Sequence, residues 1–515
     1  MTGPLFVHRR AAPVRLRDRF LLGGLVLVGV HAAGYFLFWW FSRDHVGQPI
    51  LFALLSAALV YGIARLLVGW YNALGIEQPS HVEPEPGLRV AFFITATPGE
   101  PPAMFDETLA GVARVRYPHT TYLLDDSLNL EIAEIAARHG AVRLELLNVP
   151  GAKAGKINAA LALTDEEFIV VLDPDHVPFP EMLDRVLGHF RDPRVGFVQV
   201  SQAYVNAQAS FVARAAAEQT YAFYGPTLQG MYGHGTSVVI GANGTFRRAA
   251  LESIGGHGVG LAEDLITAIR LHGAGWRGVY VPEIVSRGLV PEELGSFVKQ
   301  QLKWSRGVAE VLLVELSRAF RRLGWKQRLS YLMIGTYYFF GATTSLYNLI
   351  PLLYLAFGWL PARVDLTEWL QHAAPLGLAG VAVYIASQRF LCDPERERGL
   401  HLSGMLLKLG LFPVYLLGSV LALLRVDIPY IPTPKTAQTG RFLRLAWPPL
   451  VLLGLSLLLS FRLVWYRLHA MPEAQLRLTT GVAWGMMGFA FVNTVHLGAV
   501  VVAAFAAARI PGARA

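Results

Sequence analysis

Long apolar segments at both ends of the chain limit its possible folds more than any other feature. Seven runs are long enough to cross a membrane as helices, and they are 20–41, 50–70, 331–357, 373–390, 405–424, 447–465 and 481–508. A bilayer requires about 20 apolar residues per helix, because the backbone polar groups must bond within the helix. Charged residues make up only 16% of the chain, whereas soluble domains carry about 25%. The sequence therefore predicts an integral membrane protein.

The run 405–424 is predicted to lie in the membrane interface instead of crossing. Seven crossings would place the segment 425–446 outside the cell. The basic residues of that segment are Arg425, Lys435, Arg441 and Arg444, and positively charged loops favour the cytoplasm. The run also contains Lys408 and is interrupted at Pro413, which suits an interfacial helix. Six crossings leave both termini and the central domain in the cytoplasm, with the protein in the inner (plasma) membrane.

Between the apolar regions, short apolar runs alternate with amphipathic stretches. The predicted strands are 89–97, 119–124, 142–147, 168–172 and 195–200, and the predicted helices are 103–115, 129–138, 153–163 and 179–190. This alternation predicts an α/β domain with a mostly parallel sheet covered on both faces. The predicted parts are two membrane helices in 1–72, the α/β domain in 73–320, ending in interfacial helices, and a membrane region in 321–515. That last region has four membrane helices, the interfacial helix 405–424 and a loop at 425–446.

Two carboxylates, Asp173 and Asp175, directly follow the strand at 168–172. Its five apolar residues predict a strand buried on both faces, and Pro174 cannot donate to a sheet. The carboxyl ends of parallel strands are where α/β sheets bind ligands. Carboxylates are preferred ligands of Mg²⁺ and Mn²⁺, which often stay bound to substrate phosphates. The pair therefore indicates a metal that holds a diphosphate, with a turn carrying two solvated acids as the alternative.

Three other motifs are weak signals taken singly. Asp125 and Asp126 end a second strand, where they could accept hydrogen bonds from a nucleotide or cap the next helix. Lys153 and Lys156 open a helix, where two lysines and the helix N-terminus favour phosphate, with a solvated basic turn as the alternative. Glu263 and Asp264 begin another helix, as acids commonly do, but one of them could act as a general base.

The last motif, Gln300, Lys303 and Trp304, lies on one helix face at spacings i, i+3 and i+4. The cation could bind a diphosphate leaving group and the indole could stack on a sugar. An amphipathic interfacial helix with an anchoring tryptophan explains the same residues. The segment 241–248 adds glycines and two arginines, which could equally be surface arginines.

In this order, and flanked by membrane segments, the motifs D-D, D-x-D with His-Val-Pro, E-D and Q-x-x-K-W resemble a processive family 2 glycosyltransferase. The nearest likeness is the cellulose synthase-like branch, and hyaluronan and chitin synthases share the outline. The resemblance covers about 90–440. It implies a GT-A catalytic domain that transfers a hexose with inversion from a UDP-sugar, UDP-glucose being favoured, to a growing β-linked polysaccharide. The polymer, a β-glucan by this likeness, would pass through the membrane.

The resemblance also implies residue roles. Asp264 is the implied catalytic base, with Glu263 beside it, and Asp173 and Asp175 hold Mg²⁺ or Mn²⁺. The implied substrate-binding residues are Thr97, Asp125, Asp126, Lys153, Asp173, Gln300, Lys303, Trp304, Thr433 and Lys435. Of these, Thr433 and Lys435 belong to 430–435, which resembles the gating loop of the family and supports a cytoplasmic 425–446.

Two departures from the family pattern leave the acceptor and the degree of processivity open. Ala262 stands where threonine is usual, and Lys303 stands where arginine is usual. Lysine lacks the bidentate phosphate geometry of arginine, which Arg306 could supply. The rival functions are a glycolipid synthase that adds one or a few sugars to a membrane lipid, and a transporter with a nucleotide-sensing domain.

The charge and the cysteine content limit the partners and cross-links of the chain. The net charge of +8 fits the positive-inside pattern, and without a basic tail or a reading motif it does not indicate nucleic-acid binding. The single cysteine, Cys392, excludes an intrachain disulfide. Accessory export proteins are conceivable partners. The polymer path could be lined by Tyr337, Tyr338, Tyr347, Asn348, Asn493 and His496, which helix packing would explain equally well.

Overall fold

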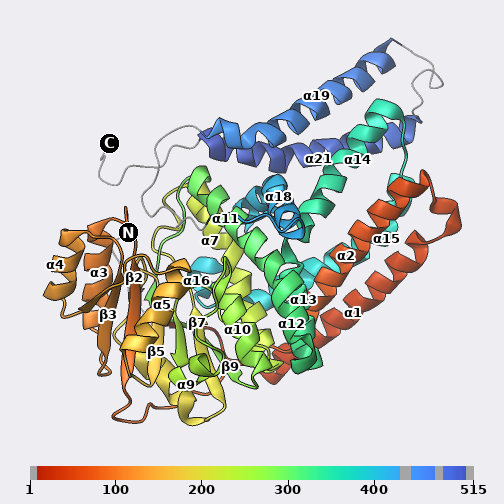
Figure 1. Cartoon of the computed structure of the whole chain (residues 1–515). Coiled ribbons are helices and arrows are strands. Elements are labelled where there is room, and N and C mark those ends of the chain that lie inside the picture. The colour runs from red at the N-terminus through yellow and green to blue at the C-terminus, as the bar shows by residue number, and fades with distance from the viewer. Residues whose placement is uncertain (1–7, 430–441, 470–478, 506–515) are drawn as a thin grey trace.

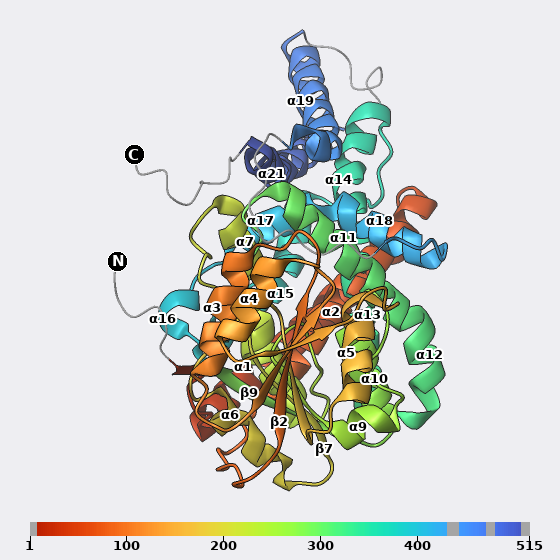
Figure 2. The same ribbon diagram turned by 60° about the vertical axis from the view of Figure 1, so that its left-hand side comes forward.

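The computed structural model describes residues 8–429, 442–469 and 479–505. An α/β domain occupies one side of the molecule, and long helices extend from it on the other side (Figure 1). The helix α11 (Leu294–Glu310) lies between the two parts in both ribbon views (Figures 1 and 2).

The domain is built on an eight-stranded sheet with the strand order β1-β9-β7-β8-β5-β2-β3-β4. The strands are β1 (Arg9–Arg10), β2 (Val90–Ala96), β3 (Thr120–Asp125), β4 (Val142–Glu145), β5 (Phe168–Leu172), β7 (Val195–Ser201), β8 (Gly244–Arg247) and β9 (Arg277–Ile284). Six strands run in one direction, and β8 and β1 run against them. A separate small sheet pairs β6 (Val177–Pro178) with β10 (Ser286–Arg287). The predicted α/β domain with a mostly parallel sheet is confirmed.

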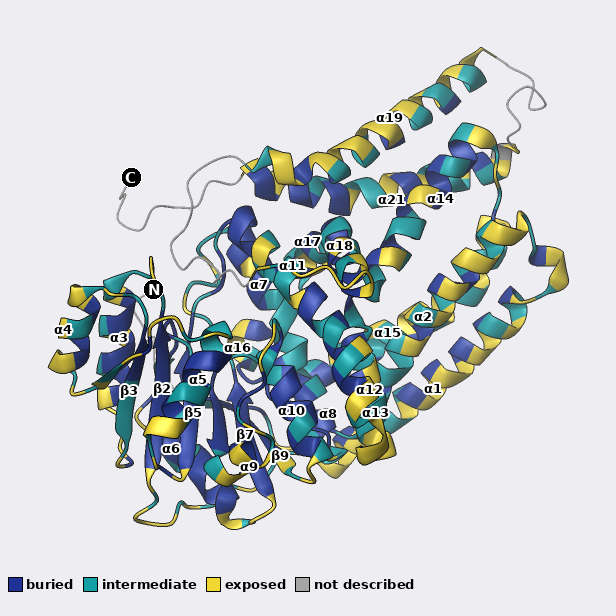
Figure 3. Ribbon diagram, viewed as in Figure 1, coloured by how far each residue is buried: buried dark blue, intermediate teal, exposed yellow. Residues whose placement is uncertain are grey.

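Helices cover both faces of the sheet, which is why β2 and β5 are buried along their whole length. One face packs against α3 (Pro102–Ala113), α4 (Leu130–Arg138) and α6 (Met182–Val186). The other face packs against α5 (Ala152–Leu163), α8 (Leu228–Gly233), α9 (Arg248–Ser253) and α10 (Glu263–Gly273). Figure 3 shows central strands of the sheet such as β5 and β7 as buried.

The segment 241–248 contains a strand instead of a loop of surface arginines. Here β8 inserts between β5 and β7 and runs antiparallel to both. Arg247 donates to the carbonyl of Val195 at 3.0 Å, and Arg248 donates to that of Leu161 at 2.7 Å. Both arginines therefore brace the sheet.

Six helices in the described residues are long and apolar enough to cross a membrane. Their ranges are Leu16–Trp40, Pro49–Leu74, Tyr337–Phe357, Leu366–Phe390, Leu443–Leu468 and Gly481–Phe505. The corresponding elements are α1 (Leu16–Trp40), α2 (Pro49–Leu74), α14 (Phe340–Phe357), α15 (Leu366–Ser387), α19 (Trp447–Leu468) and α21 (Thr480–Phe505). Figure 3 shows many exposed positions along α1 and α19.

The run 405–424 forms two helices, α17 (Leu402–Gly410) and α18 (Phe412–Leu423), bent by 53°. The chain breaks at Leu411, just before Pro413, which lies in the first turn of α18. Proline suits this position because the first turn leaves its N–H groups unpaired anyway.

The domain contacts the chain before α1, after α15 and after α18. Before α1, β1 pairs with β9. After α15, Asp393 lies 3.4 Å from Arg287 of β10. After α18, the carbonyl of Val426 accepts a bond of 3.0 Å from Arg306 of α11. At the ends of these helices that lie away from the domain, the turn between α1 and α2 meets the turn between α14 and α15. There, Gln48 N donates to Leu360 O at 2.7 Å.

The helices that follow the domain are α11, a π-turn at Val311–Glu315, α12 (Leu316–Ala319), a 3-10 turn at Phe320–Arg322, and α13 (Trp325–Gly335). Together they connect the domain to α14. Two further helices are α7 (Phe211–Ala222), which packs against α17, and α16 (Pro394–Glu397), which follows α15 in the chain.

Candidate active site

The carboxyl ends of β2, β3 and β5 bring three of the predicted groups to one edge of the sheet. Lys156 of α5 joins two of these ends, because its buried Nζ donates to Ala96 O at 2.7 Å and to Asp126 Oδ1 at 2.8 Å. Beside them, the amide of Thr97 donates to Glu100 Oε2 at 2.8 Å. The edge is therefore held together by side chains from neighbouring segments.

The adjacent acids Asp125 and Asp126 have different surroundings. Asp125 is fully buried, and its carboxylate accepts bonds from Ser127 Oγ at 2.6 Å and Arg143 Nε at 2.6 Å. Asp126 retains a partly exposed carboxylate beside Lys156. Asp126 is thus the better placed of the two to accept a bond from a ligand, and both roles stay predictions.

A potential metal-binding group follows β5. Ligand atoms of Asp173, Asp175 and His176 lie within 4.8 Å of one another. His176 is buried, and neither of its ring nitrogens makes a hydrogen bond to another described residue. Its Nδ1 lies 3.5 Å from Asp175 Oδ1. Two carboxylates and an imidazole suit a divalent cation such as Mn²⁺ or Mg²⁺.

His176 was not among the residues predicted to bind metal, although the sequence carries a signal for it. It directly follows the second acid of D-x-D. Its ring packs closely on Gly288, where an added Cβ would come 2.5 Å from His176 Nε2. The contact depends on β10 returning beside β6, so that adjacency in sequence alone does not reveal it.

Lys153 links the potential metal-binding group to the two candidate bases. Its ammonium forms an ion pair with Asp173. Burial raises the pKa values of Glu263 and Asp264, and the positive charge of Lys153 offsets part of that rise. A cation in this position could face the phosphates of a bound donor.

Glu263 and Asp264 begin α10 in a partly buried position. Asp264 accepts bonds from the amides of Gly241 at 2.5 Å and Leu265 at 2.7 Å. Burial raises the pKa of both carboxyls, and the charge of Asp264 raises that of Glu263 further. Two neighbouring acids in such a place can share one proton, so either could take up a proton from an acceptor hydroxyl.

The helix α11 crosses directly before these acids. A Cβ at Gly307 would come 2.9 Å from Leu261 Cβ and 3.0 Å from Ala262 N, so glycine permits this close crossing. The positive charge of Lys303 also lowers the pKa of Glu263. Gln300 is half-buried and Trp304 is 38% exposed on the same helix. The structure therefore brings α11 and the acid pair together.

Arg306 does not supply the bidentate contact that Lys303 lacks. Its side chain is buried and donates to Val426 O at 3.0 Å and to Asp427 Oδ1 at 3.3 Å. It also forms an ion pair with Glu310. Arg306 therefore holds the chain just before 430–441, and the predicted contacts Thr433 and Lys435 lie outside the described residues.

The residues suggested for a polymer path make contacts typical of helix packing. Tyr338 stacks on Tyr415 with a centroid separation of 5.4 Å. Asn348 lies 3.3 Å from His496, and both are buried between α14 and α21.

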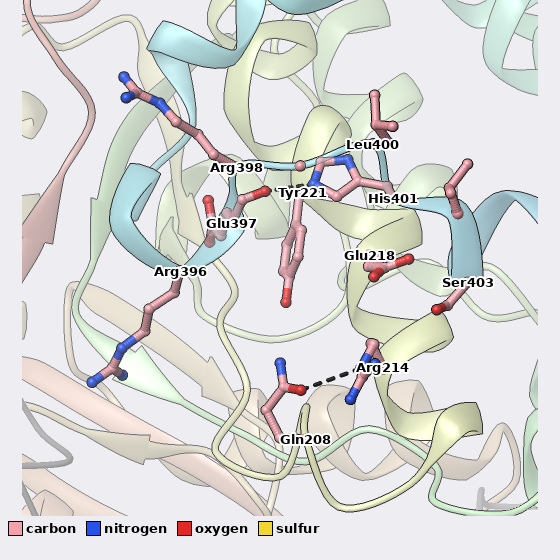
Figure 4. Close-up of a pocket in the computed structure, with 12 residues that line it drawn as sticks. Gln208, Arg214, Glu218, Tyr221, Arg396, Glu397, Arg398, Leu400, His401 and Ser403 are labelled. Carbon is pink, nitrogen blue, oxygen red and sulfur yellow. Dashed lines mark hydrogen bonds between the residues drawn. The ribbon is translucent and has the colours of Figure 1, made fainter. Parts of the chain in front are cut away.

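A pocket of about 340 Å³ lies between α7 and the segment 396–403 (Figure 4). The hydroxyl of Tyr221 points into it, and Gln208 and Arg214 lie opposite. None of the predicted site residues lines this pocket.

Comparisons with known proteins bear on the site just described. A family model described as glycosyl transferase family group 2 matches residues 168–361. A UDP-forming cellulose synthase catalytic subunit of Komagataeibacter sucrofermentans is 28% identical over a match that covers 65% of this chain and 45% of that protein. A UDP-forming cellulose synthase catalytic subunit of Pseudomonas fluorescens is 27% identical, with 67% of this chain and 49% of that protein covered. The chain spans less than half the length of these relatives.

Among solved structures, a mannosyltransferase of Pyrobaculum calidifontis in complex with GDP-mannose and Mn²⁺ is 18% identical. Its TM-score is 0.46, and the match covers 73% of this chain and all of that one (100%). The family match includes β5, the D-x-D acids, the E-D pair and α11. The chain therefore resembles glycosyl transferase family group 2 over residues 168–361, and about two thirds of it is similar to bacterial cellulose synthase catalytic subunits.

Proposed function

We propose that this chain is a membrane-embedded, inverting glycosyltransferase that polymerises a β-linked glucan from UDP-glucose. The observation that carries the proposal is the convergence of Asp173 and Asp175, the Glu263–Asp264 pair and α11 at one edge of the sheet. A donor diphosphate requires cations, and an acceptor hydroxyl requires a base. This edge offers both within one family 2 domain.

The donor half of the site would bind the UDP-sugar through charge. Asp173 and Asp175, with His176 beside them, would hold Mg²⁺ or Mn²⁺, which when bound stabilises the negative charge of the departing diphosphate. Lys153 and Lys303 add positive charge near the acid pair. Asp126 and Thr97, at the ends of β3 and β2, are the proposed contacts of the nucleoside.

The acceptor half would use Asp264 as the general base. The amides of Gly241 and Leu265 fix its carboxylate, and its raised pKa improves proton uptake from a hydroxyl. Attack on the anomeric carbon from the face opposite the diphosphate inverts an α-linked donor into a β-linked product. Trp304, partly exposed on α11, would stack on the acceptor sugar.

The proposed topology has six membrane crossings, with the domain and both termini in the cytoplasm. It is supported by the contacts that return the chain to the domain before α1, after α15 and after α18. The bend of 53° between α17 and α18 favours an interfacial position for 402–423. The growing polymer would leave through the membrane region beside α11.

The test is to incubate the purified chain with several UDP-sugars and either Mg²⁺ or Mn²⁺, and then to analyse product length and linkage. A β-linked glucan made from UDP-glucose supports the proposal. A lipid carrying one or a few sugars would instead identify a glycolipid synthase, and an absence of UDP release with every donor would refute a UDP-sugar transferase.

A further inference from the structure

The segment 318–328, which joins α11 to α14, is unusually basic. Its cations are Arg318, Arg321, Arg322, Lys326 and Arg328, and no acidic residue occurs between Glu315 and Asp365. We term residues 318–328 the basic segment. It includes the end of α12, a 3-10 turn and the start of α13.

Most cations of the basic segment have no acidic partner in the part of the chain that the structure describes. Glu315 lies 3.3 Å from Arg318 and is also bound by Arg270 at 3.0 Å. Among the described residues, no carboxylate forms an ion pair with Arg321, Arg322 or Lys326, and all three are exposed. They therefore present unpaired positive charge to the surroundings.

Two exposed arginines at the amino-terminal edge of the sheet are paired instead. Arg89 lies 2.6 Å from Asp165, and Arg194 lies 3.1 Å from Asp192. Arg321, Arg322 and Lys326 lie within six residues of one another and have no such acid among the described residues, so together they are available to a partner outside the chain.

Large apolar side chains lie among these cations. Trp325 is 64% exposed and Phe320 is 46% exposed. Lys326 lies over the Trp325 ring at 5.8 Å, and Arg328 lies over the Phe320 ring at 4.6 Å. Exposed aromatic rings mixed with cations are typical of the membrane–water interface.

Contacts with α2 place the basic segment at the domain-side end of the first membrane hairpin. The Tyr61 hydroxyl donates to Thr336 O at 2.8 Å, just past the end of α13. The 11 residues of α13 extend roughly 16 Å back towards the domain. Near the C-terminal end of α2, the ring of Tyr71 stacks on His234 with a centroid separation of 3.8 Å. Burial lowers the pKa of His234, and the positive charge of Lys326 lowers it further.

We propose that the basic segment binds the phosphate headgroups of anionic phospholipids in the membrane leaflet that faces the domain. Arg321, Arg322 and Lys326 would contact the phosphates, while Trp325 and Phe320 would enter the interface. Basic residues near such a surface each contribute about fivefold to binding. Lipid binding here does not require glycosyl transfer, so it can be tested whether or not the proposed activity is correct.

The binding would also orient the catalytic helix. α11, the π-turn and α12 follow one another without a break, and Glu315 ties this rod to Arg270 of α10. Lipid bound at the C-terminal end of α12 would therefore fix the position of α11, which carries Lys303 and Trp304, relative to the acid pair at the start of α10.

The test uses the purified full chain in mild detergent with an equimolar mixture of phosphatidylglycerol and phosphatidylcholine, and counts bound lipids by native mass spectrometry. We expect the wild type to retain phosphatidylglycerol preferentially. The triple variant R321Q/R322Q/K326Q should lose this preference, by up to about 100-fold in relative affinity for three such cations. The charge-conserving variant R321K/R322K should keep it, and added salt should weaken it.

The matched control is R89Q/R114Q/R194Q, which removes the same charge from exposed positions at the amino-terminal edge of the sheet. It should bind phosphatidylglycerol like the wild type. Loss of preference in the control as well, or its retention in R321Q/R322Q/K326Q, would overturn the proposal. Displacement of the lipid by excess inorganic phosphate would instead identify a site for soluble anions.

Discussion

At the residue scale, the electrostatics of Glu263 and Asp264 decide how the site can work. Burial raises the pKa of both carboxyls, while Lys153 lowers them. Only Asp264 is held by two backbone amides, Gly241 and Leu265. A carboxylate with a fixed direction is a better base than one free to rotate, because its acceptor geometry is prepared in advance.

Asp264→Asn is expected to lower the rate of transfer by about 10²–10⁴-fold, the usual contribution of a general base. Affinity for UDP should be retained, since the proposed donor contacts lie on other segments. Steady-state transfer assays and calorimetric titration with UDP measure the two quantities. Lost UDP binding in a folded variant would make Asp264 a donor-site residue.

Glu263→Gln provides the comparison. A general base must be deprotonated to act. Because its pKa is raised, activity should fall at a higher pH than it would with an ordinary aspartate as the base. Removing the Glu263 carboxyl should leave the position of this fall largely unchanged, because burial is the main cause that raises the pKa of Asp264, whereas the charge of Asp264 acts on Glu263. If Glu263→Gln is inactive while Asp264→Asn is active, the base is Glu263.

Asp175→Asn is expected to reduce turnover by at least about 10–100-fold, since even the indirect partners of metal ligands contribute that much. Asp175 is buried and accepts a bond from the Leu289 amide at 3.3 Å, which asparagine can preserve. Activity is measured with Mn²⁺ and Mg²⁺, with and without a chelator. Asp165→Asn removes an exposed acid (86%) and is the control. Full activity of Asp175→Asn in excess chelator would contradict a metal at this position.

At the scale of elements, the contact between α11 and α18 ties the α/β domain to the bent helix pair α17–α18. It depends on Gly418, where an added Cβ would come 2.8 Å from Ser305 Cβ. Next to Ser305, Arg306 donates to Val426, three residues beyond α18. The two contacts position the chain that enters 430–441.

Gly418→Val is expected to destabilise the protein by about 1–3 kcal/mol, because the side chain cannot fit without moving α18. The transfer rate should fall as well, since α11 carries Lys303 and Trp304. Thermal unfolding in detergent and the transfer assay check the two effects. Gly454→Val on α19 is the control, as no atom lies within 4 Å of a Cβ there. Equal stability of the two variants would show that α11 and α18 are not tightly packed.

At the scale of the whole molecule, the described contacts constrain how the chain can cross a membrane. The chain before α1 forms β1 of the catalytic sheet, so the two helices α1 and α2 leave the domain and return to it. Asp393 after α15 and Val426 after α18 also contact the domain. An even number of crossings between successive contacts satisfies all of them.

Cysteine labelling tests this topology in intact cells. Thr436→Cys should be protected from a membrane-impermeant reagent, because 425–446 is proposed to be cytoplasmic. Arg363→Cys, an exposed position in the turn that meets the end of α1, should react. The native Cys392 is buried and should contribute little background. Labelling of the Thr436→Cys variant from outside would establish a seventh crossing.

The sequence by itself was sufficient for features encoded by local periodicity and by neighbouring residues. Apolar length marked the long helices, and strand–helix alternation marked β2, β3, β4, β5 and β7 within a residue or two. These features depend on each segment's own pattern of burial, which a short window of residues carries. The D-x-D and E-D motifs were visible for the same reason.

Only the tertiary structure decided which partners those residues have. It inserted β8 between β5 and β7 and directed Arg306 to Val426. It also placed His176 beside Asp175 without a hydrogen bond to any residue that the structure describes. Each outcome depends on segments that are distant in the chain, such as β10 returning to β6. Close packing selects one arrangement among many that share the same local patterns, so a buried side chain's partner is a property of the whole fold.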